Sequence, residues 1–237
     1  CHPRPQCKRS RWLNLNGSWD FSAPDYEGSI TLPFCPESRL SGVERHFPEG
    51  CDLVYRRSVT LPEDWQGGRV LLHIGAADQH LHCYVNGAKI GEHSGGYENI
   101  TFDITDALVD GENVLAFRCM DDLRDLTQPY GKQVMKRGGM WYTPVSGIWQ
   151  TVWLESVPER YIRNVTVENR GYGVTVSVEP AMEGTVTVNL QLPGAFTPST
   201  AIWERLAAPS QYHRRRTSVI STSLSRFSAI RPKNTPA

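Results

Sequence analysis

Short runs of alternating apolar and polar residues fill most of the first 155 positions of the chain. These runs are rich in β-branched and aromatic residues and are separated by turn residues, a pattern typical of β-strands. Six runs predict strands, at 55–61, 70–74, 81–85, 100–104, 114–119 and 148–154. Residues 106–108 suit one helical turn, but no stretch before residue 155 sustains the helical period.

Two of the connections have a recognisable turn chemistry. Asn86-Gly87 lies between two apolar-containing runs, and both residues tolerate positive φ, so the pair predicts a tight hairpin. Asp110-Gly111 has the same character before the run at 114–119. Six or more short strands in about 150 residues predict a β-sandwich of the jelly-roll type.

The run 148–154 predicts a strand that is covered on both of its faces. Ile148, Val152 and Leu154 share one face, and Trp149 and Trp153 lie on the other. A strand with apolar residues on both faces is expected in the centre of a sheet. For the two tryptophans, core packing is favoured over a platform that stacks on sugars.

A second unit begins near Pro158. Strands are predicted at 161–167, 174–178 and 185–192, the last two with clean alternation. An immunoglobulin-like sandwich needs about seven strands, so three cannot close one. The predicted fold class is therefore all-β: a jelly-roll β-sandwich at 1–157 and an incomplete immunoglobulin-like β-sandwich at 158–194.

The last segment, 195–237, differs in composition from the rest of the chain. It is rich in Ser, Pro and Arg, and six Arg and one Lys face a single acidic residue, Glu204. Such a tail is also compatible with nucleic-acid or membrane binding. Disorder or an aberrant end is favoured, because the change of composition falls inside the second sandwich rather than between domains.

The overall charge limits which partners can be expected, and the cysteines indicate the redox compartment. Lys plus Arg and Asp plus Glu are equal at 25 each, which gives no global bias toward nucleic acid or membrane, and neither is predicted as a partner. The six cysteines include no CxxC pair, and Cys83 and Cys119 occupy apolar-facing strand positions. Reduced, buried thiols in a cytoplasmic protein are favoured over a disulfide. No apolar segment is long enough to span a membrane, and no signal peptide is recognisable.

Several polar residues are candidates for a metal site or a catalytic site. His80 and His82 share a strand face, but no third ligand has suitable spacing, so neither a metal site nor a cofactor is predicted. Asp121, Asp122 and Asp125 are interpreted as a solvated loop rather than as a catalytic cluster, because like charges so close together are normally left in water.

The adjacent residues Arg56 and Arg57 must point to opposite faces of their strand. One of them is expected to form a structural ion pair.

The chain resembles glycoside hydrolase family 2, the family of β-galactosidases, β-glucuronidases and β-mannosidases. The resemblance is carried by eight short motifs that follow one another in the same order as in that family. They cover residues 2 to about 192 and include HPRPQ at 2–6, WLNLNGSWDF at 12–21, PFCPES at 33–38, GAAD at 75–78, YVNG at 84–87, FDITD at 102–106, GKQ at 131–133 and MWYTPVSGIWQTVWLE at 140–155. The resemblance implies a galactose-binding-like jelly roll, then an immunoglobulin-like sandwich, then a catalytic (β/α)8 barrel. This chain resembles the first, part of the second and none of the third.

The resemblance also decides what catalysis to expect. Retaining glycosidases use two carboxyl groups about 5 to 5.5 Å apart. In this family both are glutamates of the barrel, the acid/base in an Asn-Glu pair, and the sequence contains no Asn-Glu dipeptide. No catalytic residue is therefore assigned, and the chain alone is predicted to be inactive.

In family members, loops of the jelly roll reach the rim of the sugar pocket. By resemblance, the segment 121–142 is the candidate rim here, with Asp122, Lys132 and Gln133 as substrate-binding residues. Interdomain contact without substrate is the alternative for this segment. Some β-galactosidases carry an aspartate directly before the Met-Trp pair, where this chain has Gly139, so that contact is not carried over.

Two functional hypotheses follow. In the first, the chain is the N-terminal fragment of a family 2 enzyme that hydrolyses O-glycosyl bonds. The carbohydrate substrate would bind through the missing barrel. The parent enzyme could form a homo-oligomer. In the second, it is a stand-alone carbohydrate-binding or interaction module, or one chain of a split glycosidase. The unfinished second sandwich favours the first.

Overall fold

The computed structural model of the chain describes residues 2–65, 67–123, 125, 127–136, 138–169 and 173–182, and the strands at 186–190, 199–203 and 218–223. The chain divides into two compact units, Arg9–Pro158 and Cys1–Lys8 with Glu159–Ala237. The domain limits derived from sequence, 1–157, 158–194 and 195–237, stay predictions.

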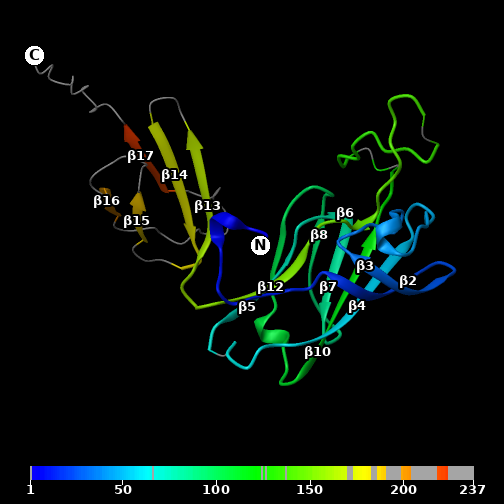
Figure 1. The fold of residues 1–237 in the computed structure, drawn as a ribbon, viewed down its shortest axis with the longest axis horizontal. Helices are drawn as coiled ribbons and strands as arrows, with labels where there is room; N and C mark the ends of the chain where they lie inside the picture. Colours follow the sequence, from blue (N-terminus) through cyan, green and yellow to red (C-terminus); the bar gives the residue numbers. More distant parts are fainter. Residues whose placement is uncertain are drawn as a thin grey trace, which may run out of the picture. The chain divides into compact units, whose positions relative to one another are not determined.

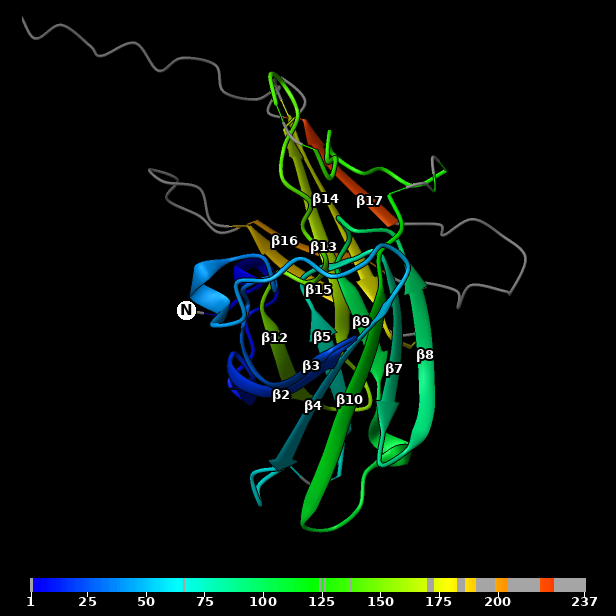
Figure 2. The same cartoon turned by 90° about the vertical axis from the view of Figure 1, so that its right-hand side faces the viewer.

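Two antiparallel sheets build the unit Arg9–Pro158 (Figure 1). Six strands form one sheet in the order β3-β2-β4-β10-β7-β8, with bounds β2 Gly17–Ala23, β3 Tyr26–Leu32, β4 Asp52–Thr60, β7 His80–Val85, β8 Ala88–Ser94 and β10 Glu112–Met120. Four strands form the other in the order β1-β12-β5-β9, with bounds β1 Trp12–Asn14, β5 Arg69–Ile74, β9 Ile100–Asp103 and β12 Val152–Val157. A short third pair joins β6 Ala77–Asp78 to β11 Gly147–Ile148. Figure 2 shows β4, β10, β7 and β8 side by side.

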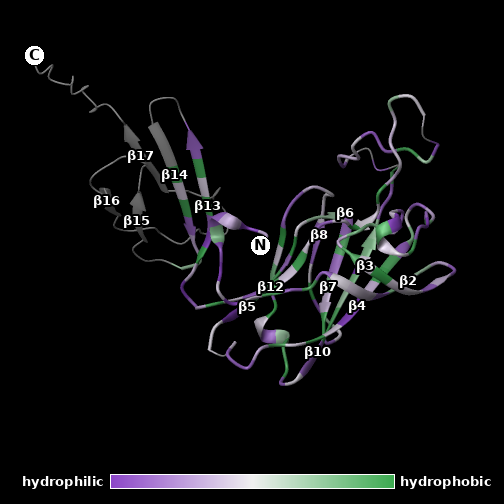
Figure 3. Cartoon of the chain, in the orientation of Figure 1, coloured by the Kyte–Doolittle hydropathy of each residue, from purple (hydrophilic) through white to green (hydrophobic). Residues whose placement is uncertain are grey.

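Alternating side chains from the inner faces of both sheets make the core. Figure 3 shows hydrophobic and hydrophilic positions mixed along the strands of this unit. The largest fully buried side chains include Trp19, Phe21, Tyr55 and Phe117, and the Trp19 and Phe117 rings lie 5.2 Å apart. Burial of each such side chain is worth about 1.5–3 kcal/mol, so the alternation read from the sequence fixes which face of each strand points inward.

The sandwich class and five of the six strands predicted before residue 155 are confirmed, as β4, β5, β7, β9 and β10. The hairpin at Asn86-Gly87 is also confirmed, since both residues have positive φ between β7 and β8. The single helical turn is the short 3-10 helix η3 Thr105–Ala107; η1 Pro5–Cys7 and η2 Arg39–Ser41 are the other two described 3-10 turns.

The prediction of one continuous strand at 148–154 is wrong. The chain leaves the ladder between β11 and β12, where the Gly75 amide donates to the Thr151 carbonyl at 2.8 Å. A Cβ at Gly75 would lie only 2.7 Å from Gln150 Cβ, so the glycine allows this close approach. The two halves consequently pair with different strands, β11 with β6 and β12 with β5.

Both faces of β12 are covered, as its sequence predicted. All six residues of β12 are buried, and the strand lies between β1 and β5. Trp153 is a core residue that stacks on His73 with ring centroids 4.7 Å apart and donates from Nε1 to Glu155 Oε1 at 3.0 Å. Trp149 is half-buried and donates from Nε1 to the Gly96 carbonyl at 2.9 Å.

The structure of this unit also tests the predictions for the cysteines and for the two adjacent arginines. Cys83 and Cys119 are fully buried free thiols, as predicted. Arg56 is exposed and Arg57 half-buried on the opposite face, and among the described residues neither forms the expected ion pair. Arg57 Nη1 instead donates to the carbonyls of Leu15 and Asn16, which connect β1 to β2, at 2.7 and 3.2 Å.

The second unit is also all-β. Its described strands are β13 Ile162–Asn169, β14 Gly173–Pro180, β15 Val186–Leu190, β16 Ser199–Trp203 and β17 Ser218–Ser223. They form a three-stranded sheet in the order β13-β14-β17 and the pair β15-β16. The three strands predicted here correspond to β13, β14 and β15, whereas β16 and β17 lie within 195–237, where the sequence shows no period. The rest of that segment lies outside the described residues.

Candidate functional site

The connection from β10 to β11, residues 121–146, is the segment from which the rim residues were predicted. Its base lies against the strand β6 and the turn that carries Glu37. Its backbone folds back on itself, because the Tyr142 amide donates to the Lys132 carbonyl at 3.0 Å and the Val134 amide to the Tyr142 carbonyl at 3.1 Å. The described residues of this segment are thus held together by backbone hydrogen bonds and attached at their base.

Gln133 ties this loop to the body of the jelly roll. Its side chain is buried, with 6% exposure, and Nε2 donates to Asp78 Oδ2 at 3.2 Å. Oε1 accepts a short hydrogen bond from the Val145 amide. Both ends of the amide are therefore occupied inside the protein.

Asp121 makes a second tie. Gln79 Nε2 donates to Asp121 Oδ1 at 3.3 Å, and the Gly50 amide donates to the Asp121 carbonyl at 2.6 Å. Asp121 is buried, so its interpretation as part of a solvated loop is wrong. Asp125 is half-buried and its side chain accepts hydrogen bonds from the backbone amide and hydroxyl of Thr127, which lower its pKa.

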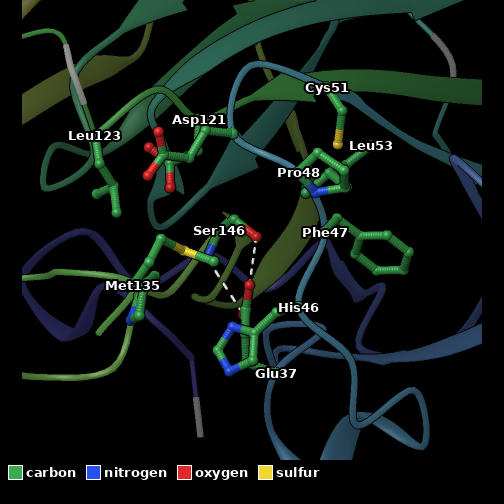
Figure 4. A pocket seen from close by; sticks show the side chains of 12 residues that line it. Glu37, His46, Phe47, Pro48, Cys51, Leu53, Asp121, Leu123, Met135 and Ser146 are labelled. Atoms are coloured by element: carbon green, nitrogen blue, oxygen red, sulfur yellow. Dashed lines mark hydrogen bonds between the residues drawn. The ribbon is translucent and has the colours of Figure 1, made fainter. Parts of the chain in front are cut away.

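Glu37 makes the third tie. Ser146 Oγ donates to Glu37 Oε1 at 2.6 Å, and the Ile148 amide donates to the buried Tyr55 hydroxyl at 3.3 Å. Figure 4 shows Glu37, Ser146 and Asp121 among the side chains that line a small cavity. This cavity has a volume of about 20 Å³. It is also lined by His46, Phe47, Pro48, Glu49, Cys51, Leu53, Leu123, Met135 and Pro144. A cavity of this size accommodates about one water molecule and is too small for a sugar ring.

Burial changes the acidity of two of these carboxyl groups. Desolvation is the largest cause for Asp78 and raises its pKa to about 6, with the neighbouring charge of Glu37 acting in the same direction. Desolvation followed by the charge of Asp78 raises the pKa of Asp121 to about 7. The base of the loop therefore holds acids that titrate near neutral pH rather than fixed anions.

The three predicted rim residues occupy different environments. Lys132 is exposed with a positive φ of 62°, Asp122 is half-buried, and Gln133 is buried. The structure thus brings Gln133 into the network with Asp78 and leaves the Lys132 side chain at the surface. The loop also exposes Trp141 and Tyr142, with 40% and 64% exposure.

Sequence reasoning missed Glu37, Asp78 and Gln79 as members of the network. Asp78 and Gln79 follow the small apolar run Gly75-Ala76-Ala77, and a polar pair after such a run was the available signal. Nothing in the local sequence pattern indicated their hydrogen-bond partners, which lie more than forty residues away along the chain. Gln133, for example, lies 55 positions from its partner Asp78.

The two histidines of β7 each lie beside a polar side chain of the neighbouring strand β8. His80 Nδ1 lies 2.9 Å from Ser94 Oγ, and His82 Nε2 lies 3.5 Å from Glu92 Oε2. Among the described residues, no group of three or more His, Cys, Asp and Glu side chains has an arrangement that could hold a metal ion. The same part of the chain contains no helix with the length and apolarity required to cross a membrane.

A sandwich of two antiparallel sheets belongs to the jelly-roll class of β-folds, which includes lectin domains. Comparison with protein families supports this class. Residues 41–158 match the family described as "Glycosyl hydrolases family 2, sugar binding domain". The chain belongs to glycoside hydrolase family 2, and the family description gives carbohydrate as the kind of partner of this domain.

Curated relatives include a β-galactosidase and a β-glucuronidase. The chain is 31% identical over 167 residues to the β-galactosidase of Thermoanaerobacter pseudethanolicus, covering 65% of this chain and 22% of the relative. It is 29% identical over 205 residues to the β-glucuronidase of Canis lupus familiaris, covering 70% of this chain and 31% of the relative. The chain thus spans less than a third of either enzyme.

Solved structures agree on the fold. The apo β-glucuronidase of Ruminococcus gnavus superposes with a TM-score of 0.65 and 18% identity, over 94% of this chain and 41% of that one. At this identity the similarity establishes the fold alone.

Proposed function

We propose that the chain is the N-terminal part of a family 2 enzyme that hydrolyses O-glycosyl bonds, of the β-galactosidase or β-glucuronidase type. Its jelly roll would be the accessory domain of that enzyme. The observation that carries the proposal is the match of residues 41–158 to the family's sugar-binding domain, together with alignments that cover 22% and 31% of two complete glycosidases.

The buried carboxyl groups of this chain support an accessory rather than a catalytic role. A retaining glycosidase presents one carboxyl group as acid/base and another as nucleophile to the same sugar. Asp78 and Asp121 instead accept hydrogen bonds from Gln133 and Gln79 beside a cavity that fits about one water molecule. Hydrolysis is therefore assigned to a barrel that these 237 residues do not resemble.

The predicted rim supports a role in shaping the substrate site. Lys132 is exposed and Asp122 is half-buried on the loop, so both are proposed to reach sugar hydroxyls directly. Gln133 is proposed to serve the rim from inside, by holding the loop on Asp78. The β-glycoside substrate and a homo-oligomer of the parent enzyme belong to the same proposal, as does a cytoplasmic location.

The alternative is a self-contained carbohydrate-binding module or one chain of a split enzyme. The encoding DNA distinguishes the two. We expect a reading frame around and beyond codon 192 that completes the immunoglobulin-like sandwich and continues into a barrel with an Asn-Glu pair. An intergenic region after the last codon, combined with measurable glycan binding by the 237-residue protein, would overturn the proposal in favour of the module.

A further inference from the structure

Carboxyl groups make much of the attachment of the loop 121–146 to the jelly roll. Gln133 donates to Asp78 at 3.2 Å, and Ser146 donates to Glu37 at 2.6 Å. At the start of the loop, Asp121 accepts from Gln79 at 3.3 Å. Any change in the charge of these acids therefore affects the hydrogen bonds at both ends of the loop.

The surroundings of Asp78 are poor in compensating charge. Asp78 is 3% exposed, and its buried Oδ1 has no hydrogen-bond partner within the part of the chain that the structure describes. The charge of Glu37 disfavours ionised Asp78, and the charge of Asp78 in turn disfavours the ionised forms of Asp121 and of the Cys119 thiol. Of the described residues, His80 is the basic group whose charge favours ionised Asp78.

Asp121 is in a similar position. Glu37, Glu49 and Asp78 all disfavour its ionised form, and the hydrogen bond from Gln79 opposes them. His46, which is exposed, lines the same small cavity. Two ionised carboxylates here would have to be desolvated side by side, which is costly in a medium of low dielectric constant.

Protonation removes this cost without breaking the ties. A neutral carboxyl group still has a carbonyl oxygen, so Asp78 can accept from Gln133 and Asp121 can accept from Gln79 in either state. Ionisation strengthens each single hydrogen bond but adds the repulsion and the desolvation of both anions. Opening the base of the loop to water relieves both.

We propose that Asp78, together with Asp121, is a proton-dependent anchor that holds the loop 121–146 on the jelly roll when the pair is protonated and loosens it when the pair ionises. Asp78 acts on the loop through Gln133 and is thus a positioning residue for the rim. The anchor makes the order of the rim a function of pH.

The sign follows from the direction of the two shifts. Both folded-state pKa values, about 6 for Asp78 and about 7 for Asp121, lie above the ordinary value of 3.8. The anchored state therefore binds more protons than the open state, and its advantage is complete below pH 4 and lost as pH rises through 6 to 7. The loop is expected to be better ordered at pH 5 than at pH 8.

Hydrogen exchange of the 237-residue protein tests this without any substrate, so its outcome is separate from that of the proposed enzymatic role. After correction for intrinsic exchange, the protection of the Tyr142 and Val145 amides should fall about tenfold between pH 5 and pH 8, the equivalent of one pKa unit of coupling. Asp78→Asn, a neutral isostere that can still accept from Gln133, should reduce this dependence to less than about threefold. Asp125→Asn removes an acid of the same loop that bonds locally to Thr127, and should leave the dependence unchanged.

Protection that is constant from pH 5 to pH 8 in the wild-type protein would overturn the proposal. So would a dependence that persists at full size in Asp78→Asn. If that variant does not fold, the amide chemical shifts of Gln133 and Val145 in the wild-type protein decide, because the anchor requires them to titrate with a midpoint between pH 5 and pH 8.

Discussion

Gln133 illustrates how a polar residue in a predicted sugar rim is used inside the domain. Its amide donates to Asp78 and accepts from the Val145 amide, and its side chain is buried. Lys132, one residue earlier, is exposed. Neighbouring positions of one loop therefore separate into an internal support and a surface group, a distinction that depends on which way the backbone turns at each residue.

Replacing Gln133 with Ala should destabilise the domain by about 1–3 kcal/mol, because Asp78 Oδ2 and the Val145 amide lose a buried partner. Lys132→Ala is the matched control and should change the free energy of unfolding by less than about 0.5 kcal/mol, as expected for a surface substitution. Urea denaturation of both variants measures the difference. Equal effects of the two substitutions would show that the hydrogen bonds of Gln133 do not stabilise the domain.

The network of acids shows the limit of prediction for single residues. Local sequence gave Asp121, Asp122 and Asp125 the same interpretation, since each is an acidic residue between strands. Asp121 differs because Gln79, which directly follows β6 and lies 42 positions away in the sequence, donates a hydrogen bond to it. The partners of a buried polar group come from tertiary structure and have no local signal.

Among the elements, many strands with a period of two could be predicted. β4, β7, β9 and β10 alternate between buried and less buried positions and were found, as was β5, an apolar run that is buried along most of its length. β2 and β3 alternate in part but were not predicted. β6 and β11 have two residues each, too few for any period, and they are the elements that carry Asp78 and lead out of the loop. The parts of the sheet nearest the candidate site were thus the least predictable.

Gly147 in β11 offers a test at this scale. It has a φ of 69°, and a Cβ there would collide with the Tyr55 hydroxyl that accepts from the Ile148 amide. Gly147→Ala should therefore cost more than the roughly 1–2 kcal/mol of left-handed strain alone. Gly111→Ala, with a φ of 87° and no heavy atom within 4 Å of the added Cβ, isolates that strain. Thermal or urea unfolding compares the two, and an equal loss in both would show that the Tyr55 contact does not constrain β11.

On the scale of the whole molecule, the order of motifs in the sequence was more informative than any one of them. Each motif is short, but together they matched the family whose sugar-binding domain spans residues 41–158. Of the tryptophans in the segment 140–155, Trp153 is a core residue that stacks on His73, whereas Trp149 is half-buried and Trp141 is exposed. The resemblance to the family places most contacts to the sugar in the barrel, so these 237 residues predict no particular sugar.

The proposed function requires that these 237 residues supply an accessory domain and no catalytic centre. The most direct test is an assay of the purified 237-residue protein with an aryl β-galactoside and an aryl β-glucuronide, beside a protein extended along the reading frame to include the proposed barrel. We predict hydrolysis by the extended protein and none above background by the 237-residue protein. Turnover by the 237-residue protein that is lost on replacing Asp78 or Asp121 with Asn would contradict the claim and place a catalytic centre within this chain.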